Sequence, residues 1–356
     1  MLVTSFQKKS SLRYGGARLP LLILLFLLIA GGIALSLRRP PLAKPTPLGK
    51  FKGLPTSVQY HNGAWYWLAQ TDAKKFVFMR VAGGNKKEIA SAEAINSFHI
   101  VEGRLVWLEK SGKEWIIRTS DEQGAGRSDL YKSSTELMGL NTAEKSLLWL
   151  QRSTPLLPFS NPYPTLSPSL DLMEMPITGG APKRLTSIPE SGTGTVLGKS
   201  DNAIYVTTYR TIRPGNGCVY RIPLESLKPV RVVSERGQPY AILTRDGMLD
   251  WAAQSNEISP PAGGTSVRRL DKQGKLETIN DFLPYPGKVF DSAQGVLFVD
   301  AEVPPTLWRM KNPDEFPTPI PVPEGYSGLA VSDNRLLYIS HTSTSMNPEL
   351  AEGLLP

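Results

Sequence analysis

The stretch Gly103-Arg104-Leu105-Val106-Trp107 carries the pattern that decides the fold. A turn residue is followed two positions later by an aliphatic or aromatic residue, and two positions after that very often by tryptophan. Six further copies of this pattern occur at 63–67, 145–149, 202–206, 247–251, 295–299 and 334–338. Their turn positions lie 39 to 57 residues apart. Such self-similarity predicts a repeat protein in which every unit has the same structure.

The residues around each copy are typical of antiparallel strands. Asn, Asp and Gly at sites such as 62–63 and 201–202 accept the positive φ angles of tight hairpin turns. Positions two and four after the turn share one face of a strand, so the tryptophans are expected to wedge between neighbouring repeats. A second apolar run and a short polar run follow most copies, as at 76–81 and 86–90. Each repeat is therefore expected to supply four strands, as in a β-propeller blade.

The expected fold class is all-β, a seven-bladed β-propeller over residues 55–343. Residues 48–53 are expected to form the outer strand of the last blade, because propellers avoid exposed edges by letting one terminus complete a blade. Residues 344–356 make a poor strand and are interpreted as a C-terminal tail. A six-bladed propeller with an irregular extension is the alternative.

The third strand of a repeat carries an apolar residue and Arg before a Gly turn. Examples are Phe78-Met79-Arg80-Val81-Ala82-Gly83-Gly84 and Val267-Arg268-Arg269-Leu270-Asp271-Lys272-Gln273-Gly274. This pattern resembles the blades of low-density-lipoprotein-receptor-type and TolB-type propellers, over most of residues 55–341. The Tyr-Trp-Thr-Asp signature of the receptor class is absent, because Tyr66-Trp67 is followed by Leu68-Ala69. The resemblance implies binding of proteins or peptides on one face.

The N-terminal region differs in charge from the rest of the chain. The 356 residues include 40 Lys+Arg and 32 Asp+Glu, a formal net charge of +8. Residues 1–52 hold nine basic residues and no acidic one, so the other 304 residues carry 31 basic against 32 acidic. The excess of positive charge therefore belongs to the N-terminal region, and no nucleic-acid partner is expected.

Residues 19–37 form a run of 19 residues without a charge. As a helix this run spans about 28 Å, close to the hydrocarbon thickness of a bilayer. We expect a single-pass transmembrane helix, with a basic tail at 1–18 before it and a Pro-rich linker at 38–54 after it. An uncleaved signal-anchor is favoured over a cleaved signal peptide, because the run is long and is closed by Arg38-Arg39. The short basic head predicts that the propeller lies outside the cytoplasm.

Motifs of catalysis or metal binding are missing from the sequence. It has no Gly-x-Ser-x-Gly elbow, no phosphate loop and no His-Glu-x-x-His. His61, His99 and His341 are too few and too dispersed to predict a metal site. Cys218 is the one cysteine, and its apolar neighbours favour a small buried hydrophobe over a reactive thiol. Neither a metal nor another cofactor is expected.

One departure from the repeat points to a binding face. The third repeat is 57 residues long because the segment 152–168, rich in Pro, Phe, Tyr and Leu, is inserted after its tryptophan strand. The equivalent connections at 209–217 and 254–264 are also enlarged. Since strands alternate in direction, these connections emerge together on one face, named here the long-loop face, and the tight turns lie on the other. The candidate binding residues are Pro155, Phe159, Tyr163, Arg210 and Arg213. The alternative is that the loops are merely tolerated insertions.

Two functional hypotheses follow. The first is a membrane-anchored propeller that acts as a binding or scaffolding module for a protein, peptide or glycan. The alternative is a propeller enzyme, a hydrolase or lyase, with its site at the mouth of the central tunnel. The first is favoured because no convergent set of acid, base or metal ligands can be assembled from the sequence. The spacer 38–47 reaches at most about 33 Å, so the tight-turn face is expected to point toward the bilayer.

Overall fold

The computed structural model describes residues 44–355, except for 73–74, 154–168, 190–191, 210–215, 237–239, 244–246, 255–264, 272–274, 284–285, 293–294, 301–305, 311–316, 333 and 345–346. Most side chains between residues 235 and 316 also lie outside the described part. The predicted transmembrane segment 19–37 is not among the described residues. Within those residues, no helix is long and apolar enough to cross a membrane.

The described secondary structure consists of strands, which form seven four-stranded antiparallel sheets. The first two sheets contain β2 (Pro55–His61), β3 (Ala64–Asp72), β4 (Lys75–Ala82) and β5 (Asn85–Ala92), then β6 (Ala94–Val101), β7 (Arg104–Ser111), β8 (Glu114–Asp121) and β9 (Ser128–Ser133). The next two contain β10 (Leu137–Ala143), β11 (Ser146–Arg152), β12 (Leu170–Pro176) and β13 (Lys183–Ile188), then β14 (Thr193–Lys199), β15 (Ala203–Tyr209), β16 (Asn216–Pro223) and β17 (Val230–Arg236). The last three contain β18 (Tyr240–Leu243), β19 (Leu249–Gln254), β20 (Thr265–Leu270) and β21 (Leu276–Leu283), then β22 (Pro286–Ser292), β23 (Gly295–Asp300), β24 (Leu307–Met310) and β25 (Thr318–Pro319), and finally β26 (Tyr326–Ser332), β27 (Arg335–Ser340), β28 (Glu349–Leu354) and β1 (Thr46–Lys50).

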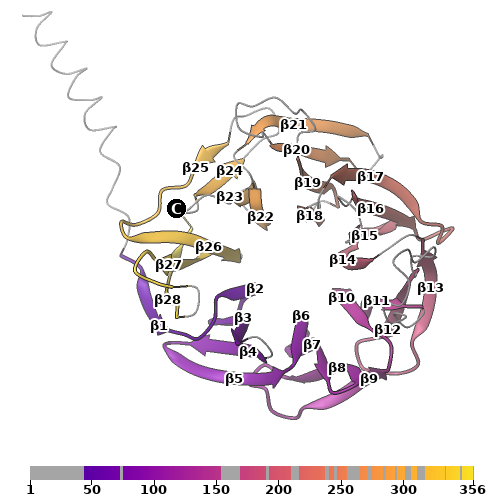
Figure 1. The fold of residues 1–356 in the computed structure, drawn as a ribbon, viewed down its shortest axis with the longest axis horizontal. Helices are drawn as coiled ribbons and strands as arrows, with labels where there is room; N and C mark the ends of the chain where they lie inside the picture. Colours follow the sequence, from indigo (N-terminus) through magenta and orange to yellow (C-terminus); the bar gives the residue numbers. More distant parts are fainter. Residues whose placement is uncertain are drawn as a thin grey trace, which may run out of the picture. The chain divides into compact units, whose positions relative to one another are not determined.

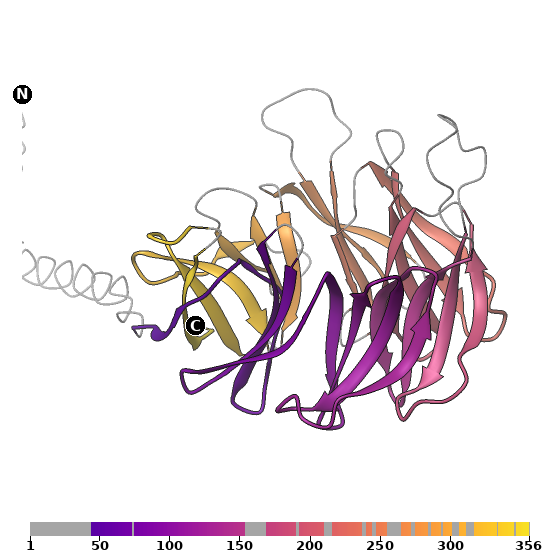
Figure 2. The ribbon, with the colours of Figure 1, turned by 60° about the horizontal axis from the view of Figure 1, so that its bottom comes forward.

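These sheets stand around a common axis as the blades of a β-propeller (Figure 1). In each sheet the first strand lies nearest the axis and the fourth lies at the rim, and the strands run between the two faces of the ring (Figure 2). Each of the seven tryptophan-pattern segments is the second strand of its sheet: β3, β7, β11, β15, β19, β23 and β27. The predictions of an all-β fold and of one pattern copy per sheet are therefore confirmed for the described residues.

The last sheet is completed by the N-terminal strand. β1 pairs antiparallel with β28, with Thr46 opposite Glu352 and Lys50 opposite Glu349. The closing strand thus spans Thr46–Lys50 instead of 48–53, because the chain bends at Lys52 and Gly53, where Gly53 takes a φ of +77°. The segment interpreted as a tail also differs, since its residues Glu349–Leu354 form β28. Pairing on both sides, with β27 and β1, supplies the strand stability that the short sequence lacks on its own.

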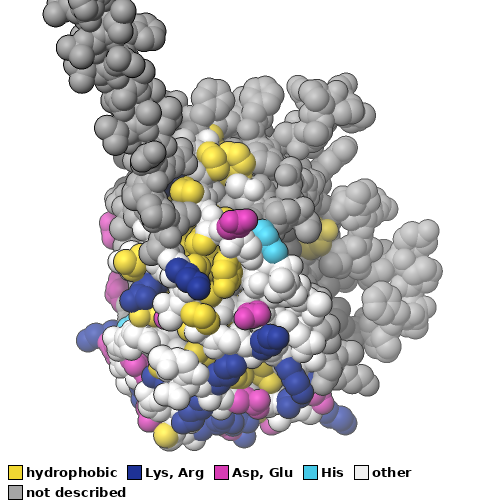
Figure 3. Space-filling model, turned by 90° about the vertical axis from the view of Figure 1, so that its left-hand side faces the viewer, with side chains coloured by type: hydrophobic (Ala, Val, Ile, Leu, Met, Phe, Trp, Pro, Cys, Tyr) yellow, Lys and Arg dark blue, Asp and Glu magenta, His cyan; other side chains and the backbone are white. Residues whose placement is uncertain are grey.

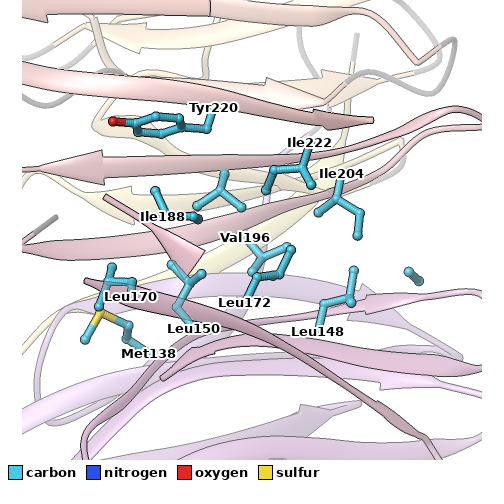
Figure 4. Packing of buried hydrophobic residues seen from close by; sticks show 12 residues of the cluster. Met138, Leu148, Leu150, Leu170, Leu172, Ile188, Val196, Ile204, Tyr220 and Ile222 are labelled. Atoms are coloured by element: carbon cyan, nitrogen blue, oxygen red, sulfur yellow. The ribbon is translucent and has the colours of Figure 1, made fainter. Parts of the chain in front are cut away.

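The core lies between neighbouring sheets. Trp149 of the third sheet is fully buried against Val106, Leu108 and Ile117 of the second. Trp67 and Trp107 are equally buried, in clusters that also combine two sheets. Figure 4 shows the next such layer, where side chains of the third sheet meet those of the fourth. This cluster includes Leu148, Leu150, Leu170, Leu172, Val196, Ile204 and Ile222. The wedge position predicted for the tryptophans is confirmed for these three.

The innermost strands share a bulge that shapes the wall of the central opening. The register of β2, β6, β10 and β14 with their second strands shifts at Ser57, Asn96, Gly139 and Leu197, in that order. At Gly139, φ is +59° and an added Cβ would lie 2.4 Å from the Cα of Thr195, so β10 and β14 are in backbone contact there. Such bulges increase twist and redirect side chains.

Candidate functional site

A cavity of about 520 Å³ lies against the first strands of four consecutive sheets, β2, β6, β10 and β14. These strands surround part of the central opening of the ring (Figure 1). Most of the side chains that line it are polar. They include Ser57, Gln59, Asn96, His99, Glu136 and Thr195. The cavity is within the size range of sites that bind small molecules or short segments of a larger partner.

On β10 and β14 the cavity reaches the strand ends that face the predicted long loops, and on β2 and β6 it lies against the middle of the strands. Glu136 precedes β10 and Thr193 begins β14, and both line the cavity. First strands begin at the face where the second-to-third connections emerge, because strand direction alternates within each sheet. The tight turns that follow the first strands, such as the one at Asn62, lie at the opposite face. Cavity and long-loop face therefore share one end of the ring.

A row of side-chain hydrogen bonds joins the cavity strands to one another. Each donor lies on a first strand, opposite the residue that stands three positions after the turn residue of the sequence pattern. It donates to a backbone carbonyl on the first strand of the next sheet. The three bonds run from Gln59 to Phe98 (3.2 Å), from His99 to Leu140 (2.7 Å) and from Asn141 to Val196 (2.9 Å). We call this row the clasp. It ends at β14, where the equivalent residue is Gly198, which has no side chain to donate.

His99 is the titratable member of the clasp. Its Nε2 faces the carbonyl oxygen of Leu140, which can only accept, so Nε2 carries the proton and Nδ1 is the acceptor. Burial lowers the pKa of His99 below its usual 6.5, and the hydrogen bond to Leu140 opposes this shift in part. The imidazole is therefore neutral at physiological pH and is occupied by a structural contact.

Glu136, the carboxylate at the rim of the cavity, is neutralised by Arg152. The Nε of Arg152 donates to Oε2 of Glu136 at 2.9 Å, and its Nη2 lies 2.8 Å from the same oxygen. Nη2 also donates to the carbonyl of Gly192 at 2.9 Å. Arg152 is only 5% exposed, although it is the first residue of the inserted segment 152–168 of the third repeat. This pair joins β11 to the connections that lead into β10 and β14, which fixes the base of the long loop.

The remaining polar groups of the cavity are uncharged. Ser57 and Asn96 are exposed at the bulges, and Thr195 is exposed on β14. The Oγ of Ser97 is buried and has no hydrogen-bond partner among the described residues. No group of three or more side chains suited to hold a metal ion occurs in that part of the chain. The arrangement is suited to hydrogen bonding with a neutral polar ligand.

The residues predicted to bind from the sequence lie outside the described residues. Pro155, Phe159 and Tyr163 fall in 154–168, and Arg210 and Arg213 fall in 210–215. Their flanks are placed: the N–H of Ser153 donates to the carbonyl of Ser169 at 3.1 Å, and Tyr209 pairs with Gly217. Both flanks lie at the cavity end of the ring.

The sequence patterns did not predict the residues that line the cavity. The polar residues that interrupt the first strands, such as Ser57, Asn96 and Asn141, were the signal that could have found them.

The histidines and the cysteine that the sequence offered as candidates for a metal site or a reactive thiol contact other side chains of the ring. His61 Nε2 lies 3.1 Å from a Glu122 oxygen at the tight-turn face, and His341 Nε2 lies 2.9 Å from the hydroxyl of Ser327. Cys218 is a partly buried free thiol on β16, packed against the core of the third and fourth sheets. The three histidines belong to different sheets and do not converge.

Comparison with known proteins identifies the fold and no family. No family model matches the chain, and no curated protein matches it. Among solved structures, it is similar to the β-propeller domain of the Trilobed protease from Pyrococcus furiosus, with a TM-score of 0.58 and 13% identity over 86% of this chain and 98% of that one. It is also similar to oligogalacturonate lyase in complex with manganese, with a TM-score of 0.56, 12% identity and coverage of 86% and 98%.

A third similar structure is the Pyrococcus horikoshii acylaminoacyl peptidase, with a TM-score of 0.60 and 12% identity over 86% of this chain. The match spans about half of that protein, 52% of its length. TolB from Acinetobacter baumannii and a nidogen/laminin complex match at TM-scores of 0.46 and 0.45. At these identities the similarity establishes the β-propeller architecture. The receptor-type or TolB-type subfamily is not distinguished from other propellers.

Proposed function

We propose that the protein is a membrane-tethered, seven-bladed β-propeller that binds a protein, peptide or glycan partner at its long-loop face. The observation that carries the proposal is the polar cavity of about 520 Å³ at that end of the ring. The inserted segment of the third repeat begins beside it, because its first residue, Arg152, pairs with Glu136 of the cavity.

Binding is favoured over catalysis by the state of the ionisable groups that line the cavity. Glu136 is held by Arg152, and the Nε2 proton of His99 is held by Leu140. A hydrolase or lyase needs an acid or base that is free to exchange a proton with its substrate. Uncharged groups such as those of Ser57, Asn96 and Thr195 supply binding contacts instead.

The tether is the part of this proposal that rests on sequence alone. Residues 19–37 serve as a single-pass signal-anchor that keeps the propeller outside the cytoplasm. β1 is the fourth strand of its sheet, so Thr46 lies at the tight-turn end of the ring and Lys50 at the other. A chain that enters at the tight-turn end leaves the long-loop face free for a partner.

Site-specific photocrosslinking tests the binding face. A photoreactive phenylalanine analogue placed at Phe159 or Tyr163 in the full-length chain is expected to yield a specific adduct in native membranes, identified by mass spectrometry. The same analogue at Lys145, in a tight turn on the opposite face, is the matched control and is expected to yield none.

A loop replacement complements the crosslinking. Residues 154–168 are replaced by Asn-Gly, which suits a hairpin because Ser153 and Ser169 already pair. The same analogue is then placed at Arg213, and the adduct that it forms in the parent protein should disappear in the loop replacement while the protein stays folded. Shortening 255–264, on the same face of the fifth sheet, is the control. Equal adducts from both faces, or adducts that survive the replacement, would contradict the proposal.

A further inference from the structure

Charge is distributed unequally between the segment that holds β1 and the first sheet and the rest of the ring. The first acidic residue of the chain is Asp72. Residues 44–92, which hold β1 and the first sheet, contain eight basic and two acidic residues, whereas residues 93–356 contain 26 basic and 30 acidic. A ring that is close to neutral elsewhere therefore has one strongly basic sector.

Four lysines of this sector lie on or beside the rim strands at the closure of the ring. Lys50 is on β1, Lys52 follows it, and Lys86 and Lys87 are on β5, the rim strand of the first sheet. All four are exposed. Lys86 joins the two strands, because its Nζ donates to the carbonyl of Lys50 at 2.8 Å and lies 4.3 Å from the centre of the Phe51 ring. We call Lys50, Lys52, Lys86 and Lys87 the seam lysines.

Few carboxylates lie beside the seam lysines: Glu349 of β28 is opposite Lys50, and Glu88 follows Lys87. Within the described residues, none of them forms an ion pair, whereas Lys132 pairs with Asp129 at 2.9 Å and Lys199 with Glu144 at 3.5 Å. Figure 3 views the side of the ring on which β1 lies, and Lys and Arg side chains gather over the lower half of that view with Asp and Glu side chains among them. Residues 44–92 thus carry an excess of positive charge, with a few carboxylates beside it.

The chain itself connects this sector to the apolar run. Only six residues separate Leu37 from Lys44, and thirteen positions separate Leu37 from Lys50. Fully extended, those thirteen positions reach about 45 Å at most. If the run spans a bilayer, the chain allows Lys50 to approach its surface and holds it within about 45 Å of it.

We infer that the seam lysines dock on the anionic headgroups of the bilayer that holds residues 19–37. This inference rests on the tether of the proposed function and adds a second, electrostatic contact to it. Clusters of Lys next to a membrane span are attracted to anionic lipids, and the attraction decays within a Debye length of about 8 Å at physiological salt. The contact gives the ring a defined orientation, with the seam toward the bilayer and the opposite side of the ring away from it.

Quenching by spin-labelled lipid headgroups tests the docking in the full-length protein reconstituted in nanodiscs. A fluorophore is attached at Asn85→Cys on β5 or at Ser226→Cys in an exposed turn of the fourth sheet, each combined with Cys218→Ser. In discs that contain phosphatidylglycerol, the label at position 85 is expected to be quenched more strongly than the label at 226. The difference should vanish in phosphatidylcholine discs and in about 0.5 M salt.

Two triple variants separate the seam from net charge. The first variant combines Lys50→Gln, Lys52→Gln and Lys87→Gln. It leaves the hydrogen bond from Lys86 to the carbonyl of Lys50 intact, and it should reduce the quenching of the label at position 85 to that of the label at 226. Lys113→Gln, Lys145→Gln and Lys183→Gln together remove the same charge from exposed sites of the second and third sheets and should change nothing.

Equal quenching at both labels overturns the docking, and so does an equal loss of quenching at position 85 in both triple variants. Binding of an acidic protein by the seam in place of the bilayer would also overturn it. A chain that fails to enter the discs contradicts the tether itself, which distinguishes the two failures.

Discussion

The same hydrogen bond between neighbouring first strands is made by three different side chains, those of Gln59, His99 and Asn141, at equivalent positions in their sheets. Each donates a hydrogen bond to the next first strand, so that neighbouring sheets are joined at the cavity as well as in the core. Two of them are amides, which do not titrate, and one is an imidazole. At the residue scale, the clasp therefore contains a single pH-dependent member among the described residues.

The stability of the protein should depend on pH through His99. Its pKa is about 6.5 when unfolded and lower when folded, so below about 6.5 the unfolded state binds more protons. The contribution of His99 to the free energy of unfolding is present in full above about pH 6.5. It is lost as the pH falls toward the pKa of His99 in the folded state. Denaturant unfolding at several pH values measures this. His99→Gln preserves the donor, as Gln59 does, and should remove the dependence near pH 6. An unchanged pH profile in this variant would contradict the assignment.

At the scale of elements, the second and first strands of a sheet differ in how well sequence predicts them. The second strands carry the turn, the aliphatic residue and often tryptophan, because both of their faces are buried between sheets, as in β7 and β11. The first strands have one unpaired edge at the cavity and contain a bulge, so their pattern is broken by residues such as Asn96 and Gly139. The clasp could not be predicted, because it requires residues about 40 positions apart to meet across two sheets.

Gly139→Ala should destabilise the protein far more than Gly63→Ala. Both glycines have positive φ, which costs about 1 kcal/mol or somewhat more for alanine. At Gly63 an added Cβ meets nothing within 4 Å, whereas at Gly139 it would also collide with the backbone of Thr195 and Gly194. We expect about 1 kcal/mol for Gly63→Ala and about 3 kcal/mol or more for Gly139→Ala. Denaturant unfolding of the two variants measures the difference, and equal losses would show that β10 and β14 are not in contact.

The closing strand β1 is held mainly by two apolar side chains. Leu48 and Phe51 are buried, and Phe51 meets the Trp67 ring edge-on with centroids 4.9 Å apart. Phe51→Ala should therefore cost about 3–5 kcal/mol and increase amide hydrogen exchange in β1 and β28 before the rest of the ring. Lys52→Ala, at an exposed neighbour, should stay within about 0.5 kcal/mol of the parent. If exchange rises uniformly across all sheets, closure is not the local event described.

For the whole molecule, closure by β1 joins the two ends of the described chain into one sheet. Strands far apart in the sequence are brought together, and Trp65 of the first sheet donates to Glu352 of β28 at 2.6 Å. The ring is therefore complete only when residues from both ends are present, which is how propellers remove exposed sheet edges.

Truncation tests this requirement. A chain that starts at Lys44 retains β1 and should unfold in one cooperative transition. A chain that starts at Leu54 lacks it, and it should unfold at a clearly lower temperature and expose apolar surface around Leu350. A synthetic peptide of residues 44–53, added to the shorter chain, should restore part of the loss. Calorimetry measures the transitions, and identical midpoints for the two chains would contradict the role of β1.

The sequence by itself determined the all-β repeat, the position of the second strand of every sheet and the location of positive charge near the N-terminus. These features are local, because hairpin turns and apolar periodicity are properties of a few adjacent residues. Only the tertiary structure decided that Glu349–Leu354 is a strand, that the closing strand expected at 48–53 spans Thr46–Lys50, and that Gln59, His99 and Asn141 form a clasp beside a cavity. These depend on which side chains meet across neighbouring sheets. The sequence of a single strand does not indicate these contacts, because the strand is stabilised by partners that are distant in the chain.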